Sequence, residues 1–545
     1  MSGARLGEKT ALLGNAHTIE LRTELIVLIS MALQVSLSTF ARIALTSIDA
    51  AFLGHLGTHE LAASSLASIW TSVPLVGVWA GASALITLCG QAWGARNRVL
   101  TGIWLQMGLL ITSILMVPVF IWYWCVGYVL AISTNDSDVV RLGTRFARIL
   151  SLSIWPSLVY ACLRLYLQSM GIMAPTTVVG ILSICVAIGA NYFLIYGGLW
   201  GWEGIGFDGS PLATVLASWF QPIALVSYSI LYKKMHRQAW GGWSRKALTM
   251  DRLKIFVSIS GPVALNSLIS NLATSGMALI AANLGSNVIA ANAVIGGLWN
   301  LLWALFWGFG CATQVRVANH LGANRPQAAK TATILGFGCT IVCVFALAIL
   351  THVSNDRIFE IYTNDKEILE LCMCVKPLLI LGSMLQSMEV LMAAVLTGMG
   401  QVKVTAWTSS LSTWFVELPI AYIGAVVLDW GFPAMWCAVV VMETIKLAVY
   451  TYTLRHIDWQ AMAWKAMATM EVTSDNEADL QREAMNYAIA EAENTPIHAN
   501  VSTPNQVHPL ILTPSRRRLR CSIDEGIRQR AILSTSKRNN SFSHV

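Results

Sequence analysis

Twelve stretches of this chain are each long and apolar enough to cross a lipid bilayer. A transmembrane helix needs about 20 predominantly apolar residues. Only 12% of the 545 residues are charged, against roughly 25% in a soluble domain, so most of the outer surface must face lipid. We therefore expect an all-α integral membrane protein with twelve transmembrane helices, at approximately 24–52, 61–92, 99–126, 141–169, 174–199, 210–232, 253–282, 288–316, 331–352, 367–397, 403–427 and 431–455.

The charges between these stretches alternate in sign along the chain. Basic residues gather in every second loop, including 233–254, and acidic residues such as Glu60 and Asp136 lie in most of the others. Lys and Arg are retained on the cytosolic side of a membrane, so we expect both termini to be cytosolic. The net charge of +7 then reflects orientation, and we expect no nucleic-acid partner.

The two halves of the chain resemble each other. A shift of 228 residues aligns leucine, glycine, alanine and tryptophan positions without a gap, and a shift of 229 continues the match later in each half. The aligned pairs include Leu56 with Leu284, Gly57 with Gly285, Trp79 with Trp307, Gly94 with Gly322 and Leu167 with Leu396. Six helices per half give both halves the same orientation, with a substrate cavity between them and alternating access by rocking of one half against the other.

These observations predict five segments. We expect a cytosolic N-terminus (1–23), an N-lobe (24–232), a basic cytosolic linker (233–254), a C-lobe (255–455) and a disordered cytosolic tail (456–545). The tail is acidic near 471–493 and basic at 516–520, and it lacks the apolar runs that a packed segment needs.

Four motifs in this order resemble the multidrug and toxic compound extrusion (MATE) family of the eukaryotic type. They are Phe52-Leu-Gly-His-Leu-Gly57, Leu88-Cys-Gly-Gln-Ala-Trp-Gly-Ala95, Arg316-Val-Ala-Asn-His-Leu-Gly-Ala323 and Gly398-Met-Gly400 with Lys403. The resemblance runs from about residue 24 to 455. It implies a V-shaped bundle of two lobes and a secondary antiporter that expels small organic solutes, often drug-like organic cations and other xenobiotics, in exchange for protons or sodium.

Asp49 is our first candidate for ion coupling. An ionisable side chain within a membrane span is costly and normally faces a cavity or a partner. Many prokaryotic members of the resembled family carry an aspartate at the end of the first helix that is linked to proton or sodium binding. The alternative is that Asp49 pairs with Arg42, seven residues earlier on nearly the same helix face, or caps the helix.

The second half departs from the family pattern of acidic residues. The positions resembling the animal-type acidic pair are Asn266 and Asn271, and the acidic position of the tenth helix falls on Gln386. Amides bind solutes or ions but do not release a proton near neutral pH. Glu389, one turn from Gln386, is therefore a candidate ion or substrate carboxylate, with a structural hydrogen bond as the alternative.

Four further polar or aromatic sites complete the candidates. Asn191 matches a position that is acidic in some archaeal and bacterial members, and packing is an equal alternative. Glu417 directly precedes Leu-Pro419 and can serve the cavity. Trp303, in a stripe with Trp299 and Trp307, can stack a flat cation or simply pack. Glu443 and Lys446 stand three residues apart on one helix and are expected to neutralise each other.

Several function classes are unsupported by the sequence. It contains no Walker motif, no HExxH and no Ser/His/Asp arrangement, so we expect neither an enzyme nor a cofactor other than the coupling ion, H⁺ or Na⁺, and no metal site. We expect a monomer whose partners are the lipid bilayer and a small organic substrate, in the plasma membrane or a vacuolar or other endomembrane. Two alternatives remain: an organic-acid exporter, which a basic residue near the cavity would suit, and a lipid-linked saccharide flippase, which calls for a more cationic cavity than Arg42 and Arg164 supply.

Overall fold

The computed structural model confirms the twelve membrane spans. It describes residues 2–134, 136–197, 203–235, 239–244, 248–354, 357–360, 362–363 and 365–471. In these ranges twelve helical spans are long and apolar enough to cross a membrane, from Leu21–Leu56 to Phe432–His456, and every regular element is a helix. The backbone of a membrane span must satisfy its hydrogen bonds internally, which is why the apolar stretches become helices.

The first half forms one bundle, the N-lobe. Its second, fourth and sixth spans are each built from more than one helical piece. The elements are α1 (Ser2–Leu56), α2 (Thr58–Ala82), α3 (Ala84–Gly94), α4 (Arg98–Ser133), α5 (Ser137–Leu150), η1 (Ser151–Ser153), α6 (Ile154–Ser169), α7 (Ala174–Tyr196), η2 (Gly206–Asp208), α8 (Gly209–Val226) and η3 (Ser227–Tyr232).

The second half forms the C-lobe and ends in an additional helix. Its eleventh span alternates α-helix with two π-helical turns, the first ending at Glu417, before Pro419 removes a backbone donor. The elements are α9 (Met250–Leu284), α10 (Ser286–Gly322), α11 (Pro326–Val353), α12 (Arg357–Glu360), α13 (Lys366–Gly398), α14 (Val402–Ser412), η6 (Thr413–Glu417), α15 (Leu418–Tyr422), η7 (Ile423–Val427), α16 (Phe432–His456) and α17 (Trp459–Glu471).

Polar side chains fix where several of these helices begin. Asn97 accepts a hydrogen bond from the Leu100 amide at 3.0 Å, and Asp136 accepts one from the Asp138 amide at 2.9 Å. Such N-caps satisfy amides that lack an intrahelical partner. Between α8 and α9, the linker folds against α4, where Gln106 donates to the Gly242 carbonyl at 2.7 Å.

The prediction of a disordered tail is wrong for residues 459–471. Residues 459–471 form α17, whose Ala463 and Ala466 are buried against α10 and α11, and whose Met470 reaches the core of the N-lobe. Apolar residues at helical spacing allow this docking. The segment is too short to span a membrane, so hydropathy alone does not predict it. The rest of the acidic part, after residue 471, and the basic part at 516–520 lie outside the described residues.

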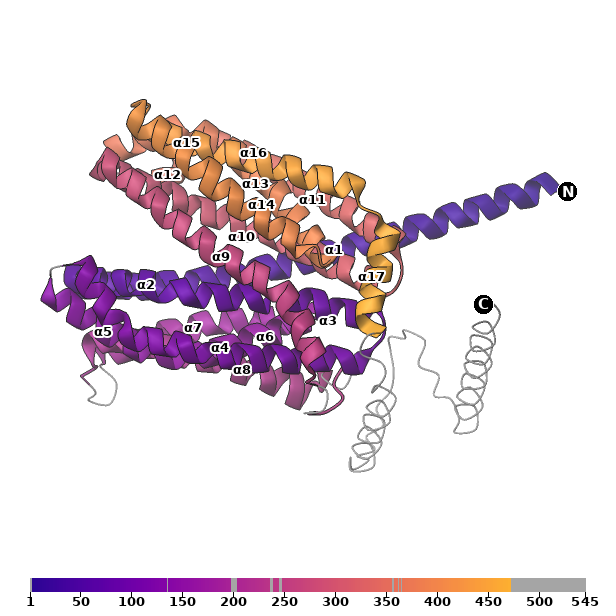
Figure 1. Cartoon of the computed structure of the whole chain (residues 1–545), viewed down its shortest axis with the longest axis horizontal. Coiled ribbons are helices and arrows are strands. Elements are labelled where there is room, and N and C mark those ends of the chain that lie inside the picture. Colours follow the sequence, from indigo (N-terminus) through magenta and orange to yellow (C-terminus); the bar gives the residue numbers. More distant parts are fainter. Residues whose placement is uncertain are drawn as a thin grey trace, which may run out of the picture. The chain divides into compact units, whose positions relative to one another are not determined.

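The two lobes meet at one end, which we call the closed end and define by Gly94 and Gly322. Figure 1 shows the two bundles approaching each other where α3 and α17 lie. Gly94 packs on the backbone of Asn319, and Gly322 packs on the backbone of Gln91. These glycines are equivalent in the internal repeat, so each half contributes the same small residue to the seam, which permits close helix contact in a membrane.

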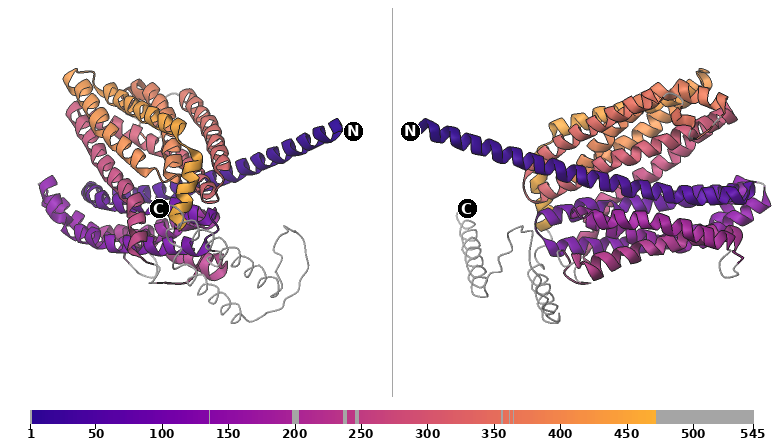
Figure 2. Two further views of the ribbon diagram at one scale, coloured as in Figure 1. Left: turned by 45° about the vertical axis from the view of Figure 1, so that its right-hand side comes forward. Right: turned by 180° about the vertical axis from the view of Figure 1, so that it is seen from behind.

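Hydrogen bonds and one ion pair reinforce the seam. Thr87 donates to the Thr397 carbonyl at 2.9 Å, and Gln91 donates to the Gly398 carbonyl at 3.1 Å. Glu24 of α1 accepts from Arg316 of α10 with both carboxylate oxygens. Towards the opposite end, which we call the open end, the bundles diverge (Figures 1 and 2).

Candidate ion and solute sites in the two lobes

Asp49 lies inside the N-lobe and is held by two neutral donors. Asn191 of α7 donates to Asp49 Oδ1 at 3.0 Å, and Thr214 of α8 donates to Oδ2 at 2.6 Å. Two predicted site residues, Asp49 and Asn191, therefore meet. The expected alternative, pairing with Arg42, is wrong, because the Arg42 guanidinium lies over the Trp79 ring, 5.4 Å from its centroid.

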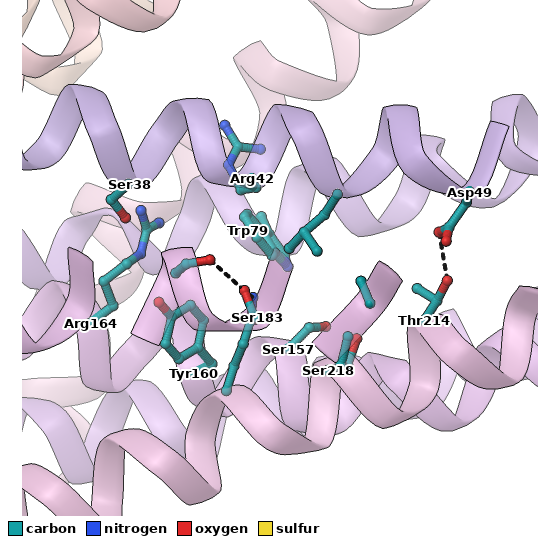
Figure 3. Close-up of a pocket in the computed structure, with 15 residues that line it drawn as sticks. Ser38, Arg42, Asp49, Trp79, Ser157, Tyr160, Arg164, Ser183, Thr214 and Ser218 are labelled. Atoms are coloured by element: carbon teal, nitrogen blue, oxygen red, sulfur yellow. Dashed lines mark hydrogen bonds between the residues drawn. The ribbon is translucent and has the colours of Figure 1, made fainter. Parts of the chain in front are cut away.

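Asp49 lines a cavity within the N-lobe. The cavity has a volume of about 160 Å³ and lies among α1, α2, α6, α7 and α8. Figure 3 shows Asp49 and Thr214 towards one side of this cavity, Arg164 towards the other, and Arg42 above Trp79 between them. Its lining includes Ser38, Arg42, Asp49, Trp79, Ser157, Tyr160, Arg164, Ser183, Thr214, Ser218 and Gln221.

The C-lobe contains a cluster of one lysine and three carboxylates, of which Glu417 is half-buried. Lys446 Nζ lies 3.0 Å from Glu443 Oε1 and 3.8 Å from Glu389 Oε1, and it also interacts electrostatically with Glu417. The expected pairing of Glu443 with Lys446 is confirmed. Glu389, Glu443 and Lys446 are all buried, and the cluster carries more carboxylates than cations.

The three C-lobe amides do not join this cluster. Asn266 accepts a hydrogen bond from Ser410 at 2.9 Å, which ties α9 to α14. The Asn271 carbonyl accepts from Ser275 within α9, and its side chain is half-buried. Gln386 is half-buried one turn before Glu389 on α13, and no hydrogen bond of its side chain is found among the described residues.

Trp303 is engaged by a neighbouring tryptophan. Its ring stacks on Trp307, with centroids 5.3 Å apart and an interplanar angle of 19°. Trp299 instead contacts Trp436 edge-on at 5.4 Å. The stripe is thus divided between two aromatic pairs, and this packing favours the structural interpretation of Trp303.

Thr214 is the residue of the Asp49 site that the sequence analysis missed. A threonine in an apolar span usually bonds to its own helix backbone, and Thr214 also makes that bond, to the Ser210 carbonyl at 3.2 Å. No sequence signal distinguishes it from the other hydroxyl residues of the spans. Its role emerges only when α1, α7 and α8 are packed together.

Comparisons with known proteins give the chain its family. The MatE family profile matches residues 27–193 and 262–423. Multidrug and toxin extrusion protein 2 of Mus musculus is 27% identical over 486 residues, covering 88% of this chain and 83% of that protein. Multidrug and toxin extrusion protein 1 of Homo sapiens is 26% identical over 463 residues, covering 85% and 79%.

Solved structures agree on the fold. The eukaryotic MATE transporter AtDTX14 superposes with a TM-score of 0.74 at 20% identity, covering 83% of this chain and 99% of that one. A point mutant of the Vibrio cholerae MATE transporter VcmN gives a TM-score of 0.72 at 16% identity, covering 81% and 99%. The family profile spans more than half of the chain, and the relatives are transporters rather than enzymes. The chain belongs to the MatE family and is a multi-pass membrane transporter of the eukaryotic MATE type.

Proposed function

We propose that this transporter is a secondary antiporter that exports small organic solutes in exchange for protons or sodium ions. The mouse and human relatives are named multidrug and toxin extrusion proteins, which supports outward movement of drug-like solutes. The loop charges favour the cytosolic side for the closed end. Contact between the lobes at that end corresponds to an outward-facing state, and the seam must separate for the solute to enter from the cytosol.

The observation that carries the proposal is the charge imbalance of the C-lobe cluster. Among the described residues, Lys446 is the only cation that forms an ion pair with Glu389 or Glu443, and it also interacts electrostatically with Glu417. Each ionised side chain in a membrane span costs about 2.5–3.5 kcal/mol or more, so uncompensated carboxylates favour binding of a cation. A buried site that takes up and releases a proton or sodium ion can couple its gradient to the movement of the lobes.

Asp49 offers a second place for a cation. Its carboxylate, the Thr214 hydroxyl and the Asn191 amide oxygen are ligands of the type that hard cations prefer. Asn191 Oδ1 is buried and has no hydrogen-bond partner among the described residues, so it is available as a further ligand. Either lobe can therefore hold the exchanged ion, and substitutions at Asp49 and at Glu389 distinguish which lobe does so.

The test is efflux from proteoliposomes that contain the full chain. The vesicles are loaded with radiolabelled benzenesulfonate or N-methylpyridinium, so that the assay does not depend on the sign of the solute's charge. An inward proton or sodium gradient should accelerate loss of at least one probe. Glu389→Gln should remove that acceleration, because the neutral amide neither takes up a proton nor supplies the negative charge that attracts sodium. Glu370→Gln, at an exposed site of the same helix, should retain it.

Two results would contradict the proposal. The first is efflux of both probes that responds to neither gradient. The second is full gradient stimulation in all three of the variants Glu389→Gln, Glu443→Gln and Asp49→Asn, which would leave neither lobe as the coupling site.

A further inference from the structure

Two arginines in the N-lobe cavity have no carboxylate partner among the residues that the structure describes. Arg42 of α1 and Arg164 of α6 both line the cavity, and neither forms an ion pair with any carboxylate of those residues. Arg164 Nε is buried without a hydrogen-bond partner. Charged residues inside membrane spans normally pair with each other, so this absence calls for an explanation.

Asp49 does not supply the missing negative charge. Its two carboxylate oxygens are occupied by Asn191 and Thr214. It also lies seven residues from Arg42, about 10 Å along the helix axis. The cavity lining therefore carries two positive charges and at most one negative charge, which is already hydrogen-bonded and lies apart from Arg164 (Figure 3).

We infer that the N-lobe cavity binds an organic anion: a small, flat solute whose carboxylate or sulfonate group lies between Arg42 and Arg164. This rests on the proposed export function and names its substrate class. Guanidinium groups bind such anions through paired, charge-assisted hydrogen bonds. The rings of Trp79 and Tyr160 also line the cavity and provide aromatic contact for the solute.

The size of the cavity limits the solute at this site to about one ring. Its volume is about 160 Å³, and an engineered protein cavity of about 150 Å³ accommodates benzene. A single-ring anion fits, whereas a larger solute would have to extend out of the cavity. Benzenesulfonate and N-methylpyridinium are suitable probes because each has one aromatic ring and a permanent charge of opposite sign.

Asp49 has a defined effect on such an anion. Its negative charge repels the anion, so neutralising Asp49 strengthens anion binding, whereas it would weaken binding of an organic cation. A proton or sodium ion at Asp49 likewise assists an anion rather than competing with it. Exchange of an anion against a cation therefore places the competing cation elsewhere, and the C-lobe carboxylates provide that site.

The experiment is calorimetric titration of the full chain in lipid nanodiscs with each probe, without any ion gradient. Benzenesulfonate should bind more tightly than N-methylpyridinium. Arg42→Gln and Arg164→Gln should each weaken benzenesulfonate binding by about tenfold or more, the usual effect of losing a charged hydrogen bond, and Asp49→Asn should strengthen it. Arg148→Gln is the matched control, because Arg148 is exposed on α5 beside Trp124, and it should leave the affinity unchanged.

A charge-conserving variant separates binding from folding. Arg164→Lys keeps the positive charge and should retain more affinity than Arg164→Gln, and every variant is compared by thermal unfolding. Replacing gluconate with chloride at equal ionic strength should leave the benzenesulfonate affinity unchanged.

The inference is wrong if benzenesulfonate does not bind, if N-methylpyridinium binds as tightly, or if both glutamine variants keep the original affinity. It is also wrong if chloride displaces benzenesulfonate, because the cavity would then be a site for inorganic anions. None of these results affects gradient-driven efflux and its dependence on Glu389, so the proposed antiport can stand when this inference fails.

Discussion

Gly322→Ala should drive the two lobes apart at the closed end. A Cβ atom added at Gly322 would lie 2.0 Å from the Gln91 carbonyl oxygen and 2.7 Å from its carbon. Both neighbours are backbone atoms, so no side chain can rotate away. The helices must separate by about 1.4 Å to restore an ordinary contact of 3.4 Å.

The expected energy follows from this overlap. Forcing one extra methyl group into a tightly packed contact costs about 1–3 kcal/mol. That cost applies only to the state in which the seam is closed, so the ratio of closed to separated seams should fall by about 5- to 150-fold. Gly94→Ala should act in the same way, since its added Cβ would lie 2.0 Å from the Asn319 carbonyl oxygen.

The assay is a distance measurement across the open end. Spin-labelled unnatural amino acids at Ile132 and Leu279, both exposed near the open ends of α4 and α9, report the separation of the lobes. If the lobes rock, Gly322→Ala should shift the distance distribution towards shorter values. Gly296→Ala is the matched control, because it lies on the same helix and its added Cβ meets nothing within 4 Å.

The double variant sharpens this test. Once the seam has opened for one methyl group, the second costs little, so Gly94→Ala with Gly322→Ala should shift the distribution by less than the sum of the single effects. An unchanged distribution in Gly322→Ala, or an equal shift in Gly296→Ala, would refute the assignment of the seam as the gate.

Two further substitutions test the C-lobe cluster and α17. Lys446→Met should lower the free energy of unfolding by about 3–5 kcal/mol, because it leaves buried carboxylates without their cation. Thermal unfolding in nanodiscs measures this loss, and adding Glu443→Gln to Lys446→Met should restore part of the stability. A Lys446→Met protein as stable as the original would contradict the role of Lys446 in the cluster. Met470→Glu should release α17, since Met470 is buried against the N-lobe core. Hydrogen exchange should then rise in residues 459–471 but not in α16. Unchanged protection of residues 459–471 would mean that α17 is not docked through Met470.

The spans and the repeat were predictable because both depend on local or regularly spaced signals. Hydropathy along the chain marks each membrane crossing, and the glycines Gly94 and Gly322 recur at a fixed interval. The contacts that polar side chains make between helices were less predictable. In a membrane protein both the lipid-facing and the buried faces of a helix are apolar, so the sequence of α1 does not indicate that Asp49 faces Asn191 and Thr214 rather than Arg42.

In the C-lobe cluster, too, contacts within one helix were predictable from the sequence and contacts between helices were not. The Glu443–Lys446 pair was predictable because a spacing of three residues brings the two side chains together on one helix. The contact of Lys446 with Glu389 joins α16 to α13, and its origin lies in how the helices pack. The amides at Asn266, Asn271 and Gln386 made Glu389 a candidate, but nothing local indicated that Asn266 would bond to Ser410.

The internal repeat also relates the two charged sites to each other. The 229-residue shift that aligns Leu167 with Leu396 places Tyr160 on Glu389. A shift of 222 residues aligns Gly209-Ser-Pro211 with Gly431-Phe-Pro433, at the starts of α8 and α16, and places Gln221 on Glu443. Tyr160 and Gln221 line the N-lobe cavity, so the acidic cluster occupies the corresponding place in the C-lobe.

Equivalent positions in the two lobes thus differ in charge, being neutral in the N-lobe and acidic in the C-lobe. If both lobes served the same cation, their cavities would share the sign of their charge. Instead the N-lobe cavity has two arginines, Arg42 and Arg164, and one carboxylate, Asp49. The C-lobe cluster has three carboxylates and one lysine. An anion in one lobe and an exchanged cation in the other is the division of roles that this asymmetry favours. Neutralising one charge in each lobe tests it. Glu389→Gln should remove the ion dependence of efflux without changing benzenesulfonate affinity, and Arg164→Gln should weaken benzenesulfonate binding without removing the ion dependence of efflux. Loss of both properties in either variant would show that the lobes do not act separately.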